Sequence, residues 1–121
     1  MSDGDEEITP GELNELLEAG EDVRIVDIRS RAEFDRGSIP GSENVPFGNL
    51  PREIEGLAGA DRIVTVCPHG KASLQAVRII DSYEGTTGRV QSLEGGIEAW
   101  RRDYALESAE GSETDVPDAP F

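Results

Sequence analysis

Short β-branched runs alternate with amphipathic stretches through the middle of the chain, a pattern typical of alternating strands and helices. Strands are expected over residues 23–28, 44–45, 62–66 and 90–93. Helices are expected over residues 10–19, 31–36, 50–57, 73–83 and 97–102. This alternation predicts an α/β fold, a small parallel β-sheet flanked by helices on both faces.

Two of these elements have especially clear signals. Thr9, Pro10 and Glu12 form a helix-start pattern, with Thr at the N-cap, Pro at the first position and Glu at the third. The run 62–66 has almost no polar interruption, which suits a strand buried on both faces of a parallel sheet. Cys67 follows this strand directly, and functional sites of such sheets lie beyond the carboxyl ends of the strands.

The composition is strongly acidic, with 26 acidic and 11 basic residues and a formal net charge of -15. Such a surface should repel nucleic acid and anionic membranes, so neither is expected as a partner. Only one of the basic residues is Lys, a balance that resembles proteins of salt-accumulating archaea. An ordinary acidic protein with charged tails is the alternative.

A chain of 121 residues has room for one domain. We expect this domain over residues 8–104, between acidic disordered tails at 1–7 and 105–121, whose composition cannot bury enough surface to become ordered. The sequence has no apolar run of bilayer-spanning length and no secretory signal. A single Cys rules out an internal disulfide and fits a reducing cytoplasm, the expected location.

The candidate chemistry is concentrated in one loop. The only Cys, the only His and the only Lys are Cys67, His69 and Lys71. A Cys acts as a nucleophile in its thiolate form, which nearby positive charge and a helix N-terminus favour. Gly70 lets the backbone curl so that several N–H groups can converge on one anion. The alternative is a buried Cys that serves as a small hydrophobic residue.

Four segments resemble the motifs of the rhodanese family of sulfurtransferases, in the family's order. They are residues 26–29 (VDIR), 33–46 (EFDRGSIPGSENVP), 67–73 (CPHGKAS) and 93–100 (LEGGIEAW). The resemblance covers residues 8–103 and implies a single-domain, thiosulfate sulfurtransferase-like enzyme.

The resemblance implies that Cys67 takes the outer sulfur of a donor such as thiosulfate and becomes a persulfide. The sulfur then passes to cyanide, a small thiol or a protein acceptor, with no cofactor. The residues expected to bind the persulfide are Pro68, His69, Gly70, Lys71, Ala72 and Ser73.

Three departures from the family pattern affect this interpretation. Ala72 stands where Arg is common, and the neighbouring Lys71 could supply the missing charge. Pro68 and His69 replace other frequent residues of the loop, and Ser38 replaces a His. A weakly active or non-catalytic carrier or regulatory module is therefore the alternative. A Cys-based phosphatase would need Arg at position 73, where this chain has Ser.

Three further interpretations concern residues near the loop. Asp27 and Arg29 are expected to support the site by ordering the loops around it. His69 could bind a metal only with more Cys or His ligands than the chain has, so we expect no metal site. The pair Gly95 and Gly96 is expected to allow close backbone approach before the last helix.

Overall fold

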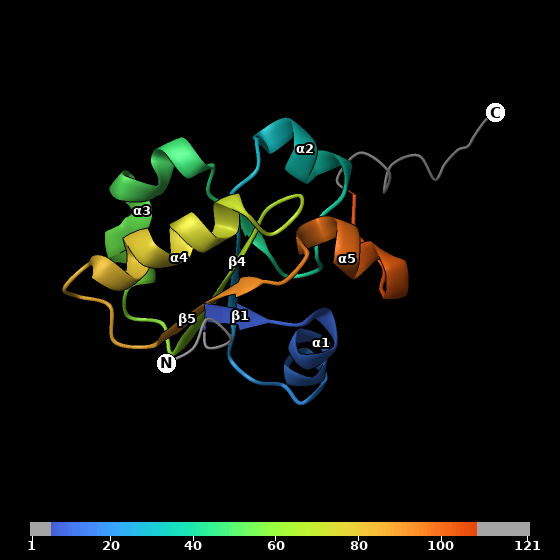
Figure 1. Ribbon diagram of the computed structural model, residues 1–121, viewed down its shortest axis with the longest axis horizontal. Coiled ribbons are helices and arrows are strands. Elements are labelled where there is room, and N and C mark those ends of the chain that lie inside the picture. The colour runs from blue at the N-terminus through green and yellow to red at the C-terminus, as the bar shows by residue number, and fades with distance from the viewer. Residues whose placement is uncertain (1–5, 109–121) are drawn as a thin grey trace.

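The computed structural model describes residues 6–108, which form a five-stranded parallel sheet between two layers of helices (Figure 1). The strand order is β1-β5-β4-β2-β3. The strands are β1 (Glu7–Ile8), β2 (Arg24–Asp27), β3 (Glu43–Asn44), β4 (Arg62–Val66) and β5 (Arg89–Leu93). The helices are α1 (Pro10–Glu18), α2 (Arg31–Arg36), α3 (Leu50–Leu57), α4 (Ala72–Ser82) and α5 (Gly96–Asp103), with a short 3₁₀ helix at Phe47–Asn49. The predicted α/β fold is confirmed.

Two hydrophobic clusters, one on each face of the sheet, hold the layers together. Helices α3 and α4 cover one face, where Leu50 and Ile80 pack with Ile63 of β4. Helices α1 and α5 cover the other face, where Leu13 and Trp100 belong to the second cluster. Side chains of a strand alternate between faces, so the almost uninterrupted apolar run of β4 supplies both clusters.

The first two helices begin with capping boxes. Thr9 Oγ1 accepts a hydrogen bond from the Glu12 amide at 3.1 Å, and Glu12 Oε1 accepts one from the Thr9 amide at 3.0 Å. Ser30 and Glu33 make the same exchange at the start of α2. Both boxes satisfy amide groups that a helix N-terminus would otherwise leave unpaired. The helix start expected at Thr9 is confirmed.

Strand β1 is an element that the sequence pattern did not predict. It has two residues, and it pairs in parallel with β5 through Glu7 and Ser92. Nothing in so short and acidic a segment indicates a strand, because its partner β5 lies far along the chain. The packed part of the chain therefore begins before residue 8.

The packed part also extends beyond residue 104. The backbones of Ser38 and Glu107 exchange two hydrogen bonds, at 2.8 and 2.7 Å. The indole of Trp100 donates to the Ala105 carbonyl at 3.0 Å, and Leu106 packs against the second cluster. Residues 1–5 and 109–121, the remainder of the two predicted tails, lie outside the described residues.

An ion pair joins the edge strand β3 to β2. The guanidinium of Arg24 donates to both carboxylate oxygens of Glu43 at 2.8 Å and to the Gly56 carbonyl at 2.8 Å. The hydrogen bonds to Glu43 raise the pKa of Arg24 above its ordinary value.

Within residues 6–108, no helix is long and apolar enough to cross a membrane.

Candidate active site

Cys67 lies at the carboxyl edge of the sheet, directly after β4. Strand β4 lies between β5 and β2, so the residue that follows it is surrounded by the loops of its neighbours. The loop from Pro68 to Lys71 then leads into α4. Only 2% of the Cys67 surface is exposed. The predicted position of the thiol, at a strand end below a helix start, is the one that the structure has.

The sulfur of Cys67 is held by hydrogen bonds from the loop that it begins. Sγ accepts from the Gly70 amide at 3.0 Å and from the Ser73 amide at 3.3 Å. The hydroxyl oxygen of Ser73 lies 3.3 Å from Sγ and is placed to accept from a thiol. The same hydroxyl can rotate and donate to a thiolate. Both amides and this hydroxyl can therefore stabilise negative charge on the sulfur.

Three buried hydroxyl groups lie beneath the loop, those of Thr65, Ser73 and Ser92. Of the three residues, only Ser73 was predicted from the sequence to belong to the site. Ser73 Oγ lies 2.6 Å from Ser92 Oγ, and Thr65 Oγ1 donates to the Ser73 carbonyl at 2.8 Å. Thr65 and Ser92 are register partners on β4 and β5, and all three residues are buried. The available signal was Thr65 inside the apolar strand β4, whereas Ser92 is one of several polar residues in β5. When Ser92 donates to Ser73, Ser73 is free to donate to the sulfur.

Three glycines let the backbone of the Cys67 loop pack against the start of α5. Gly70 has φ 88°, and a Cβ there would lie 2.8 Å from the Gly95 nitrogen. The amides of Ile97 and Glu98 donate to the carbonyls of Cys67 and Pro68 at 2.9 and 3.1 Å. This confirms the close approach expected at Gly95 and Gly96.

The curled loop also presents amide groups that remain available. Within the described chain, the N–H groups of His69, Lys71 and Ala72 have no hydrogen-bond partner. Successive amides around a glycine with positive φ form a concave anion-binding arrangement. The dipole of α4, which begins at Ala72, adds to the positive potential there.

The remaining side chains of the loop surround this opening. His69, Lys71 and Ala72 are exposed, and Pro68 is half-buried. In the part of the chain that the structure describes, the Lys71 ammonium has no ion pair and the His69 ring has no hydrogen bond. Among residues 6–108, no group of three His, Cys, Asp or Glu side chains is placed to hold a metal ion.

Asp27 and Arg29 form a buried ion pair beside the site. The Asp27 side chain is 1% exposed, and Arg29 Nη2 donates to Asp27 Oδ2 at 2.8 Å and to the Gly37 carbonyl at 2.6 Å. The Arg29 amide and Nε both donate to Asp27 Oδ1 at 3.0 Å. The pair therefore joins the end of β2 to the turn after α2, and both carboxylate oxygens are already occupied.

Comparisons with known proteins agree with this fold. A family model described as rhodanese-like domain matches residues 9–103. The chain belongs to the rhodanese-like domain family, as the four sequence motifs implied.

Several relatives within this family are named sulfurtransferases. A thiosulfate sulfurtransferase, GlpE, of Pseudomonas aeruginosa is 32% identical over 114 residues, which is 92% of this chain and 97% of that protein. A putative sulfurtransferase, YtwF, of Bacillus subtilis is 31% identical over 94 residues, covering 78% of this chain and 88% of the relative.

Solved structures show the same architecture. The rhodanese-like domain of an Anabaena protein, solved by solution NMR, superposes with a TM-score of 0.76 at 26% identity. That comparison covers 96% of this chain and 89% of the Anabaena chain.

The contacts of the sulfur give a prediction that separates the roles of Ser73 and Lys71. Ser73→Ala removes the hydroxyl next to Sγ and is expected to slow alkylation of Cys67 by iodoacetamide near neutral pH about tenfold. The reason is that a hydrogen bond to a charged group contributes about 1.5–3 kcal/mol. Lys71→Ala should slow alkylation less, about twofold, because the ammonium is exposed and its field is screened by solvent.

Two residues of α4 provide matched controls. Ser82→Ala removes another hydroxyl, in the last turn of the same helix, and Arg78→Ala removes another exposed positive charge. Both should leave the alkylation rate unchanged. A larger effect of Lys71→Ala than of Ser73→Ala would show that the ammonium, and not the buried hydroxyl, controls the sulfur.

Proposed function

We propose that this protein is a sulfurtransferase that accepts a sulfane sulfur on Cys67 as a persulfide and transfers it to a thiophilic acceptor. The observation that carries the proposal is the setting of Sγ, which accepts hydrogen bonds from the amides of Gly70 and Ser73 within a rhodanese-like domain. Thiosulfate is the donor that we favour, because relatives such as the Pseudomonas protein are named for it.

The reaction consists of two displacements at sulfur. In the first, the Cys67 thiolate attacks the outer sulfur of thiosulfate, a new S–S bond forms, and sulfite leaves with the electron pair of the broken S–S bond. In the second, the acceptor, cyanide or a thiolate, attacks the outer sulfur of the persulfide, and Cys67 leaves as a thiolate. The enzyme returns to its starting state without an external oxidant or reductant.

The loop supplies electrostatic stabilisation for both steps. The amides of Gly70 and Ser73 hold the inner sulfur, whose charge must return when the acceptor attacks. The unpartnered amides of His69, Lys71 and Ala72 can hold the charge of the outer sulfur. Fixed donors of this kind act as an oxyanion hole does and need no reorganisation during the reaction.

Three features favour sulfur transfer over other chemistry of a reactive Cys. Cys67 exposes only 2% of its surface, so the donor must present a narrow terminal atom. Within residues 6–108, the hydrogen-bond partners of Sγ come from Gly70 and Ser73, and neither a carboxylate nor an imidazole is among them. Displacement at sulfur needs no general base, whereas acyl transfer usually does. A Cys-based phosphatase would need an Arg at position 73 to bind the phosphate, and this chain has the buried Ser73 there.

Ala72 supports a second candidate, a sulfur carrier or regulatory module with weak turnover. The exposed Ala72 offers no guanidinium to an anionic donor, and the exposed Lys71 is the nearest replacement in the sequence. A carrier would form the persulfide once and release the sulfur only to its own partner. A protein acceptor and a cytoplasmic location fit either candidate.

The test is to incubate the full chain with thiosulfate, remove the excess and measure the intact mass. The protein should gain the mass of one sulfur atom and lose it again when cyanide is added. Thiocyanate release over many turnovers would support the enzyme, and a single release would support the carrier. If the mass never increases, the proposed persulfide chemistry with this donor is wrong.

A further inference from the structure

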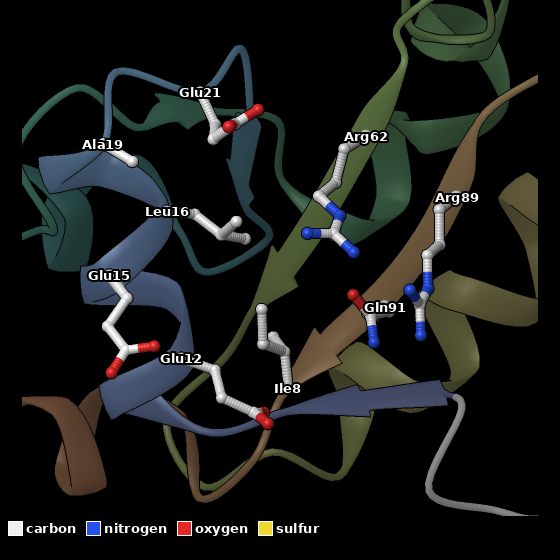
Figure 2. Close-up of a pocket in the computed structure, with 9 residues that line it drawn as sticks. All are labelled: Ile8, Glu12, Glu15, Leu16, Ala19, Glu21, Arg62, Arg89 and Gln91. Atoms are coloured by element: carbon white, nitrogen blue, oxygen red, sulfur yellow. The ribbon is translucent and has the colours of Figure 1, made fainter.

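A second hollow lies at the opposite edge of the sheet, between α1 and the first residues of β4 and β5. This α1 groove has a volume of about 320 Å³. Its sheet side carries Arg62, Arg89 and Gln91, and Ile8 and Leu16 add apolar surface (Figure 2). Arg62, at the start of β4, lies about 16 Å along that strand from Cys67. The Cys67 side chain belongs to the hydrophobic cluster on the face covered by α3 and α4, whereas Ile8 and Leu16 of the groove belong to the cluster on the other face. The groove therefore takes no part in the sulfur chemistry.

Gln91 at the floor of the groove has one polar atom without a partner. The residue is 4% exposed, and its Nε2 donates to the Glu7 carbonyl at 3.2 Å. This hydrogen bond fixes the orientation of the amide, because a flipped amide would set two oxygens against each other. Among the described residues, Gln91 Oε1 is the buried side-chain atom that lacks a hydrogen bond. An unpaired buried acceptor is costly, so a donor in the groove would be stabilised.

Arg62 and Arg89 make the sheet side of the groove positive. They are register partners at the starts of β4 and β5, so their side chains leave the same face of the sheet. Figure 2 shows both guanidinium groups beside Gln91. Within residues 6–108, neither arginine side chain has an ion pair or a hydrogen bond, although the chain has 26 acidic residues. Two free guanidinium groups side by side suit a carboxylate, which each can bind through two parallel hydrogen bonds.

The opposite side of the groove carries negative charge. Glu12, Glu15 and Glu21 line it from α1 and the turn that follows. Glu12 is engaged in its capping box, but Glu15 and Glu21 have no ion pair within the described chain. A simple anion would be attracted by the arginines and repelled by these carboxylates. A simple cation would be attracted by the carboxylates and repelled by the arginines. A molecule with both charges matches both sides.

We propose that the α1 groove binds a small zwitterion of the amino-acid type. Its carboxylate lies between Arg62 and Arg89, and its ammonium group donates to Gln91 Oε1 and faces the carboxylates of Glu15 and Glu21. The size of the groove, at the lower end of ligand pockets, suits a molecule as small as an amino acid. The site is independent of Cys67, and the proposal stands or falls separately from sulfur transfer.

The test uses the full chain, labelled with ¹⁵N, at low ionic strength so that the exposed charges are not screened. Each of the common L-amino acids is added separately up to about 10 mM, the range of weak binding. At least one should shift the side-chain amide signals of Gln91 and the signals of Arg62 and Arg89. For that amino acid, the acid without the amino group and the amine without the carboxylate should each bind at least about tenfold more weakly. Equal binding of the acid, or no shift with any amino acid, would overturn the proposal.

Substitutions then locate the site. Arg62→Gln and Arg89→Gln should each weaken binding about tenfold or more. Arg102→Gln is the matched control, since Arg102 is an exposed arginine on α5 outside the groove, and it should bind like the unchanged protein. Gln91→Met removes the unpaired oxygen at nearly constant length and should also weaken binding. If this buried change prevents folding, the two arginine variants still decide, because unchanged affinity in both would disprove the site.

Discussion

Replacing Cys67 by Ser is expected to abolish sulfur transfer and to leave the fold intact. A serine hydroxyl ionises far less readily than a thiol and is a weak nucleophile without an adjacent base, so turnover should fall at least about 10³-fold. The smaller oxygen can still accept from the amides of Gly70 and Ser73, so the free energy of unfolding should change by less than about 1 kcal/mol. Thiocyanate production and urea unfolding measure the two quantities.

Cys67→Ala separates the nucleophile from the loop that holds it. Alanine removes the acceptor and leaves the buried amides of Gly70 and Ser73 unpaired, which costs about 1–3 kcal/mol of stability. Both variants should therefore be inactive, but only the alanine variant should be clearly less stable. Turnover above a few per cent in Cys67→Ser would contradict the assigned nucleophile.

Gly96→Ala is expected to have the second large effect, this time on both stability and activity. Gly96 has φ 63°, and a Cβ there would lie 2.2 Å from the Cys67 carbonyl oxygen and 2.6 Å from that of Pro68. Backbone atoms cannot move aside as a flexible side chain does, so α5 and the loop must separate. This would break the hydrogen bonds from Ile97 and Glu98 to the loop. The lost hydrogen bonds and the unfavourable φ of an alanine at this position should together lower the free energy of unfolding by about 2–4 kcal/mol.

Thermal unfolding gives a direct measurement of this loss, with a midpoint lowered by roughly 10 °C or more for a domain of this size. Gly56→Ala is the matched control. Gly56 lies in α3, and a Cβ there would have no atom within 4 Å, so alanine should raise stability by about 0.5–1 kcal/mol. A Gly96→Ala variant as stable as the unchanged protein would show that the close approach is not a requirement of the fold.

Local sequence patterns predicted most of the fold because each relied on neighbouring residues. The apolar run of β4 located the central strand, and the position of Cys67 at its end followed from the strand itself. The capping residues around Thr9 predicted the start of α1. Strand β1 escaped prediction because its two residues are defined only by pairing with β5, far along the chain.

The surroundings of the sulfur could not be predicted for the same reason. Thr65 and Ser92 belong to different strands, and only the register of β4 and β5 places them side by side below Ser73. Arg62 and Arg89 are two ordinary surface charges in the sequence, and the same register makes them neighbours. A strand pattern reveals which face a residue takes but not which residue stands beside it.

The bridge between Ser38 and Glu107 bears on the order in which this domain assembles. It joins a turn near the first third of the chain to the segment after α5, and the pairing of Glu7 with Ser92 spans most of the chain as well. Closing such a long loop costs conformational entropy, and the few hydrogen bonds of each contact offset little of that cost. We expect them to form after the β2-β4-β5 centre and to be the first to exchange their amide hydrogens. The outermost segments of the domain are therefore expected to pack last, after the loop that holds the Cys67 sulfur has formed.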